Sequence, residues 1–150
     1  MLHAPKLLLV VVLLSGAVAC DSGRHSSAGF RLPADGNVER GKAAFVALGC
    51  HQCHEVPGTD LPRPTIQPPV PVPLGGVVTR EITDGYLVTS IINPSYELAP
   101  YARDFIMVGG KSRMPDYRDS ITARQLTDMV AFLQSRYTIQ LPTKYPYYGR

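Results

Sequence analysis

The sequence is short of several things on which large classes of protein depend. It has 150 residues, no tryptophan, 8% aromatic residues and only three cysteines. Charged residues make up 18% of the chain and the formal net charge is +3, which excludes the strongly basic surface that nucleic-acid binding requires. Three cysteines cannot build a four-ligand zinc site without histidine, and any disulfide scheme leaves one thiol over. The hydrophobic content of 45% at this length indicates one folded domain.

The chain also lacks an apolar run long enough to cross a membrane as a helix. Its longest apolar run covers residues 7–14 and follows a basic residue, Lys6, and small residues at 15–19 then lead to Cys20. A basic start, a short apolar run and a stretch of small residues, in this order, are typical of a secretory signal. We therefore predict a signal peptide over residues 1–19 and export of the mature chain.

The segment that ends at Cys20 resembles the lipobox of bacterial lipoproteins, in which the cysteine is lipidated and becomes the first mature residue. That resemblance implies a membrane anchor at Cys20. Asp21 directly after it resembles an inner-membrane retention signal of bacterial lipoproteins, so we expect a position on the periplasmic side of the cytoplasmic membrane. Plain cleavage at the same bond, with Cys20 left as a free thiol, is the alternative. Residues 20–33 are polar and rich in serine and glycine, and they predict a flexible tether from membrane to domain.

The other two cysteines lie in a C-x-x-C-H motif at residues 50–54. This motif is the attachment signature of a c-type haem, because Cys50 and Cys53 can reach two vinyl groups on one side of the porphyrin while His54 ligates the iron. A zinc site would need further paired ligands, a thioredoxin-like motif would need a βαβ context, and a Cys50–Cys53 disulfide would close a short, strained loop. Since the motif occurs once, we predict one covalently attached haem c.

The segment before this motif predicts an amphipathic helix over residues 37–48. Asp35 or Asn37 can cap its N-terminus, and Gly49 suits a left-handed stop directly before the cysteines. The helix thus delivers the chain to the motif in a defined direction.

Two further helices are predicted downstream. Residues 84–92 form a short helix, capped by Thr83 or Asp84, that ends before an Asn-Pro pair. Another helix begins at a capping box. The box consists of Thr122 and Gln125, and the apolar stripe that follows it contains Leu126, Met129, Val130, Leu133 and Tyr137, with Phe132 beside it. We assign Met129 to the core, because it lies within this continuous stripe.

With these features together, residues 36–138 resemble the class I cytochrome c family. In that family a glycine and an aromatic residue four positions apart, here Gly41 and Phe45, let the first and last helices cross closely. The resemblance implies an all-α fold of three to four helices around one covalently bound haem. We place this domain at residues 34–138, and a tyrosine- and proline-rich tail follows at 139–150.

The sixth iron ligand is predicted on a second stretch of the same resemblance. Residues 112–117 resemble the family's S-x-M-P-x-aromatic segment, which implies that Met114 is the axial ligand opposite His54. Pro115 stiffens the backbone that presents the sulfur. The resemblance also implies that Arg113 and Tyr117 contact the haem. Met107, His25 and a vacant position are the alternatives.

The middle of the chain is dominated by proline, with half of the 14 prolines between residues 57 and 73. Such a segment forms neither a helix nor a central strand, and we expect an extended chain along one haem edge. In the family a Pro-x-Leu-x-Gly stretch packs on the haem, and its proline carbonyl accepts a hydrogen bond from the proximal histidine. Here Leu74 and Gly76 match that stretch and Pro73 adjoins it, but Val72 stands at the proline position. A docking ligand for a partner protein is the other reading of this segment.

Two filled axial positions leave no vacancy on the iron, so we expect a carrier of single electrons and not an enzyme. Redox proteins on the outer face of the membrane are the expected partners, and Arg40, Lys42, Lys111 and Arg113 could frame a docking face. The alternatives are a fixed subunit of a larger respiratory or dehydrogenase complex, or a haem-based gas or redox sensor.

Overall fold

A computed structural model describes residues 30–140 of the chain. The predicted signal peptide, Cys20, residues 21–29 of the tether and residues 141–150 of the tail lie outside the described residues. Within 30–140, no helix is both long and apolar enough to span a bilayer. The elements are α2 (Val38–Ala47), η2 (Cys50–Gln52), β1 (Gly76–Val78), α3 (Asp84–Ile92), α4 (Arg103–Ile106), β2 (Met107–Val108), β3 (Lys111–Ser112), α5 (Ala123–Gln134) and β4 (Tyr137–Ile139).

The three helices predicted from the sequence are present, and their ends depend on side-chain caps. The Asn37 side chain accepts from the Arg40 N–H at 2.9 Å and begins α2. Thr83 caps α3 in the same way, because its hydroxyl accepts from the Tyr86 N–H at 3.1 Å. The capping box of α5 is complete, with both reciprocal hydrogen bonds formed. Each cap satisfies N–H groups that have no partner inside the helix.

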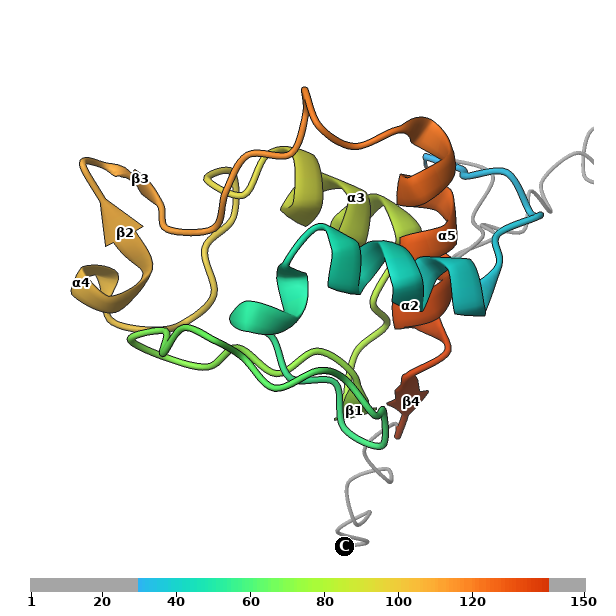
Figure 1. Ribbon diagram of the computed structural model, residues 1–150, viewed down its shortest axis with the longest axis horizontal. Helices are drawn as coiled ribbons and strands as arrows, with labels where there is room; N and C mark the ends of the chain where they lie inside the picture. The colour runs from blue at the N-terminus through green and yellow to red at the C-terminus, as the bar shows by residue number, and fades with distance from the viewer. Residues whose placement is uncertain (1–29, 141–150) are drawn as a thin grey trace, which may run out of the picture.

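The core forms where α2 crosses α5 (Figure 1). At the crossing, a Cβ on Gly41 would overlap the Asp128 carbonyl and lie 2.7 Å from the Phe132 Cβ. Only glycine lets the two backbones approach this closely. One turn along, Phe45 meets Phe132 edge-to-face with ring centroids 5.6 Å apart, and both rings are buried. The expected crossing at Gly41 and Phe45 is confirmed, and Met129 is a core residue with 1% exposure.

An ion pair joins the N-terminal end of α2 to α5 beside this crossing. The buried Asp128 carboxylate accepts from the Arg40 guanidinium at 2.7 and 2.9 Å and from the Asn37 backbone N–H at 2.8 Å. The Arg40 hydrogen bonds, followed by the one from Asn37, lower the pKa of Asp128 against the effect of burial. The first residues of α2 are therefore fastened to the middle of α5.

The described residues form four α-helices, in line with the expected helical fold, and they add two short strand pairs that the sequence did not predict. α5 ends at Gln134, so Tyr137 does not extend the helical stripe and instead begins β4, which pairs in parallel with β1. β2 and β3 form a small antiparallel hairpin around Gly109 and Gly110, both with positive φ. Such a two-residue turn requires positive φ at both positions, which glycine adopts without strain.

Gly41→Ala is expected to lower the free energy of unfolding by about 3 kcal/mol or more, because the added methyl has no space against the α5 backbone. Urea unfolding measures this. Gly85→Ala in α3 is the matched control, because its Cβ would meet only the Phe30 Cβ at an ordinary 3.6 Å. That variant should be neutral or stabilising by up to about 1 kcal/mol. Equal losses in the two variants would contradict the close crossing.

Asp128→Asn is expected to destabilise the domain at neutral pH and to weaken its acid dependence. The pKa of Asp128 lies below its ordinary value of 3.8, so the stabilisation from its charge is fully present above that value. It is lost as the pH falls through the folded-state pKa. The stability difference between wild type and variant should therefore shrink as the pH is lowered from about 7 to about 3. Asp35→Asn, in the exposed pair with Arg124, should show little difference across this range.

Candidate functional site

The C-x-x-C-H motif folds into a tight turn at the end of α2. Gly49 has φ of +74° and stops the helix, and Cys50 then starts the short 3-10 helix η2. The Cys50 carbonyl accepts from the Cys53 N–H at 3.2 Å and from the His54 N–H at 3.0 Å. This turn gathers both thiols and the imidazole into one small region. Cys50 is buried and Cys53 half-buried, and neither is in a disulfide.

The imidazole of His54 is oriented by a backbone group. Its Nδ1 lies 2.9 Å from the carbonyl oxygen of Val72, which can only accept a hydrogen bond, so Nδ1 carries the proton. Nε2 therefore keeps its lone pair free for a metal. Burial lowers the pKa of His54, against the opposing effect of this hydrogen bond, and so favours the neutral, metal-binding form.

The proline at this point of the family pattern is dispensable because the contact is a main-chain one. Val72 supplies the carbonyl, its N–H donates to the Cys53 carbonyl at 3.3 Å, and the Leu74 N–H donates to the Glu55 carbonyl at 2.8 Å. The segment around Val72 thus runs beside the cysteine turn and is held to it on both sides of the acceptor. Leu74 packs against the core, whereas Pro73 is exposed.

The residues present fit a covalently attached haem. Two thiols and an imidazole with a free Nε2 lie in one turn, and the imidazole has the carbonyl partner that metal-ligating histidines usually have. Within residues 30–140, no group of three or more His, Cys, Asp or Glu side chains could hold a metal ion. Cys50, Cys53 and His54 would bind such a haem, and Met114 is the candidate for its second axial position.

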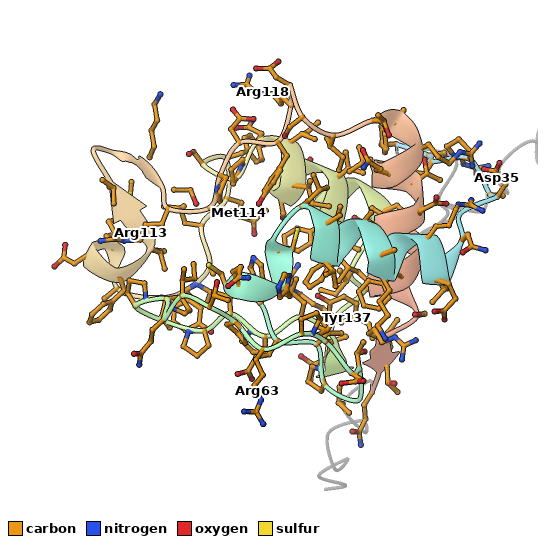
Figure 2. The ribbon with its side chains drawn as sticks, in the orientation of Figure 1. Asp35, Arg63, Arg113, Met114, Arg118 and Tyr137 are labelled. Carbon is orange, nitrogen blue, oxygen red and sulfur yellow. The ribbon has the colours of Figure 1, made fainter. Side chains whose placement is uncertain are left out.

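Met114 is linked to the cysteine turn by Tyr117. Met114 is half-buried against the core, and its N–H donates to the Ser112 hydroxyl at 3.2 Å. Three residues on, the Tyr117 hydroxyl donates to the Leu48 carbonyl at 3.1 Å, two positions before Cys50. Because three residues of extended chain span at most about 11 Å, Met114 lies near the same turn. Figure 2 shows Met114 on the η2 side of the molecule, away from α5.

Burial dominates the titration of the groups between these two segments. It raises the pKa of the Cys50 thiol to about 11. It also raises the pKa of Tyr117 to about 12, with the neighbouring Cys50 and Cys53 thiols acting in the same direction. Both groups are therefore neutral at physiological pH, and the site carries no fixed charge from either of them.

Arg113 and Tyr117 were both expected to contact the haem, but they make hydrogen bonds in different parts of the molecule. Its guanidinium donates to the Asp104 carbonyl in α4 at 3.4 Å, and its N–H donates to the Ile106 carbonyl at 2.8 Å. Arg113 therefore fastens the β2–β3 hairpin to α4, and within residues 30–140 it makes no hydrogen bond to the cysteine turn. Met107, the alternative ligand, lies in β2 of the same hairpin, paired with Ser112.

The four basic residues expected to frame a docking face do not lie together. Arg40 binds Asp128 at the crossing, and Lys42 follows it on α2. Lys111 and Arg113 belong to the hairpin arm on the opposite side of the molecule (Figure 1). The structure therefore places these four residues in two separate groups, one on α2 and one on the hairpin arm.

Sequence reasoning missed two polar residues inside the motif itself. The Gln52 side chain accepts from the Thr65 and Ile66 N–H groups at 2.7 and 3.3 Å, and its amide nitrogen lies 3.0 Å from His51 Nε2. His51 is buried, and its Nδ1 has no partner in the described part of the chain. Haem attachment leaves the two middle residues of the motif unspecified, so no pattern could have marked them.

Comparison with known families gives a match over most of the described domain. The family model described as Cytochrome c covers residues 38–136, which is about two thirds of the chain and includes the cysteine turn, Met114 and the α2–α5 crossing. No curated protein and no solved structure matches the chain.

Met114→Ala should abolish the thioether-to-iron charge-transfer band of the oxidised haem protein, because alanine offers the iron no ligand. Absorption spectroscopy of purified protein measures this. Met107→Leu is the matched control and should keep the band, since its hairpin is fastened to α4 and not to the cysteine turn. A band that survives in Met114→Ala and disappears in Met107→Leu would move the axial ligand to Met107.

Proposed function

The chain belongs to the cytochrome c family, whose members carry electrons on a covalently attached haem, and on this premise we propose that it is a single-haem electron carrier tethered to the outer face of the cytoplasmic membrane. The observation that carries the proposal is the pairing of the His54 Nδ1–H with the Val72 carbonyl beside two free thiols. It prepares one imidazole nitrogen for one iron. The single motif in the sequence supports a count of one haem.

When bound, the haem supplies one-electron exchange at its iron. The protein's part is to attach, orient and enclose. Cys50 and Cys53 would fix the porphyrin edge at the turn, and the Val72 carbonyl holds the His54 ring against rotation. The Tyr117–Leu48 hydrogen bond keeps the Met114 segment close to the same turn. Few groups need to move when the charge on the iron changes, which suits rapid electron transfer.

A carrier is favoured over a gas or redox sensor by the way Met114 is held. A sensor needs a sixth ligand that leaves readily. Here Met114 lies between Ser112, which accepts its N–H, and Tyr117, which is fastened to α2. Pro115 adds a fixed φ directly after the ligand. A ligand on such a braced segment would remain in place in both oxidation states.

The proposed anchor joins the domain away from the site. Leu32 packs against the core, and Asp35 and Asn37 bond to α5 through Arg124 and Asp128. In Figure 1 the blue segment that precedes α2 lies on the side of the molecule opposite the β2–β3 hairpin. A lipid on Cys20 would therefore anchor the domain from the side opposite the hairpin. The cysteine turn and the hairpin would remain accessible to partners. These include soluble redox proteins and a larger respiratory complex.

Ligand binding and fractionation test this function together. The reduced full-length protein should not bind carbon monoxide at neutral pH, whereas Met114→Ala should bind it, because only that variant has an open axial position. The wild-type protein should titrate as one electron per chain and fractionate with membranes. Carbon monoxide binding by the wild type would favour the sensor and contradict the carrier.

Cys20→Ser is the control for the anchor. It should release the protein from the membrane fraction with an unchanged haem spectrum, because residue 20 lies outside the domain matched by the family. Membrane association that persists in this variant would point to a partner complex in place of a lipid. Release together with loss of haem would contradict the separation of anchor and carrier.

A further inference from the structure

We propose that Gln52 is a positioning residue that clips the proline-rich segment to the cysteine turn, so that this segment keeps water from the side of the site that holds Cys50 and Cys53. The inference rests on the proposed haem carrier and extends it to the reduction potential. It also gives residues 57–73 a role other than that of a docking ligand.

The clip is a single amide group with its hydrogen bonds satisfied on both sides. Gln52 Oε1 accepts from the Thr65 N–H at 2.7 Å, from the Thr65 hydroxyl at 3.1 Å and from the Ile66 N–H at 3.3 Å. Because backbone N–H groups can only donate, they fix which end of the amide faces the segment. Gln52 Nε2 therefore faces His51 and donates to its Nε2 at 3.0 Å.

The segment needs this external fastening because of its composition. Residues 62–73 contain six prolines, which have no N–H, so a regular backbone ladder is impossible. Of the remaining N–H groups, those of Thr65 and Ile66 bond to Gln52, and that of Val72 bonds to Cys53. The segment is thus held at its middle and at its end, and both attachments are to the C-x-x-C-H motif.

Between these two attachments the segment passes along the cysteine turn. Figure 1 shows it in green beneath η2, and Figure 2 shows Arg63 pointing away from the domain, so its charge faces solvent. At the other end of the segment, the Val72 carbonyl orients the His54 ring. Loss of the Gln52 clip would free the middle of the segment while leaving that orientation intact.

Shielding the side of the site that holds Cys50 and Cys53 would change the reduction potential. The oxidised iron–porphyrin unit carries one more positive charge than the reduced unit, and water stabilises the more highly charged form. A segment that excludes water therefore favours the reduced state. Gln52 affects the potential without touching the iron, by determining where residues 65–71 lie.

Amide hydrogen exchange on the wild-type protein as purified tests the clip directly. The amides of Thr65 and Ile66 should exchange more slowly than that of Gln67, which has no acceptor in the described part of the chain. In Gln52→Leu both should exchange about 3- to 10-fold faster, the size expected for one net hydrogen bond. Gln52→Glu keeps an oxygen acceptor for both N–H groups and should retain the slow exchange. Unchanged exchange in Gln52→Leu, or loss of protection in Gln52→Glu as well, would overturn the clip.

The midpoint potential tests the consequence. Gln52→Leu should shift the oxidised-to-reduced ratio at a fixed ambient potential about 3-fold toward the oxidised form, which corresponds to a decrease of about 30 mV. Thr65→Val, which loses only the hydroxyl contact, is the matched control and should change the potential by much less. Gln52→Glu is unsuitable as a control for the potential, because its added negative charge would lower the potential by itself.

The outcomes separate this inference from the proposed function. A potential in Gln52→Leu equal to that of the wild type, with faster exchange, would overturn the shielding. A purified wild-type chain without haem would overturn the carrier, while the exchange rates would still decide the clip. The charge-transfer band should be unchanged in all of these variants, because Met114 is held by a different set of contacts.

Discussion

The contact between Gly41 and the backbone of α5 is the constraint on which the rest of the molecule depends. It sets the distance at which two helices from opposite ends of the domain cross, and the Phe45–Phe132 pair and the Asp128 ion pair fit that distance. α2 then ends at Ala47, two residues before Gly49, so the crossing also determines where the cysteine turn emerges. Tyr117, shortly before α5, reaches back to the end of α2 at Leu48. The cysteine turn and the Met114 segment, which could both ligate an iron, are thereby both attached to the C-terminal end of α2.

Main-chain carbonyls orient two of the side chains at this site. Val72 and Leu48 each present a carbonyl oxygen, one to His54 and the other to Tyr117. Such contacts depend on the path of the backbone and not on the side chain. They are strong where they are shielded, because a carbonyl without a donor in a buried place is unfavourable. The valine at position 72 therefore serves as well as the family's proline, provided that the chain is held in the same place by Cys53 and Glu55.

The sequence predicted what depends on local chemistry. The bounds of α3, the cap of α2 at Asn37 and the capping box of α5 follow from side chains within a few residues of each other. The C-x-x-C-H spacing likewise marks its own chemistry. The β1–β4 pair could not be foreseen, because two three-residue strands about 60 residues apart have no periodicity to detect. Gln52 was invisible for a related reason, since its partners lie 13 and 14 positions away in a segment with no regular structure.

The burial of Cys50 has a consequence for the reactivity of its thiol. A thiol with a pKa of about 11 is a thiolate in only about one molecule in ten thousand at neutral pH, and the thiolate is the reactive form. That burial belongs to a core to which α5 contributes, and α5 lies downstream of the motif in the chain. While α5 is still absent, the motif lies on a chain that cannot complete its core. The packing of residues 123–134 completes the core that buries Cys50, so its thiol is less reactive in the folded domain than in the unfolded chain.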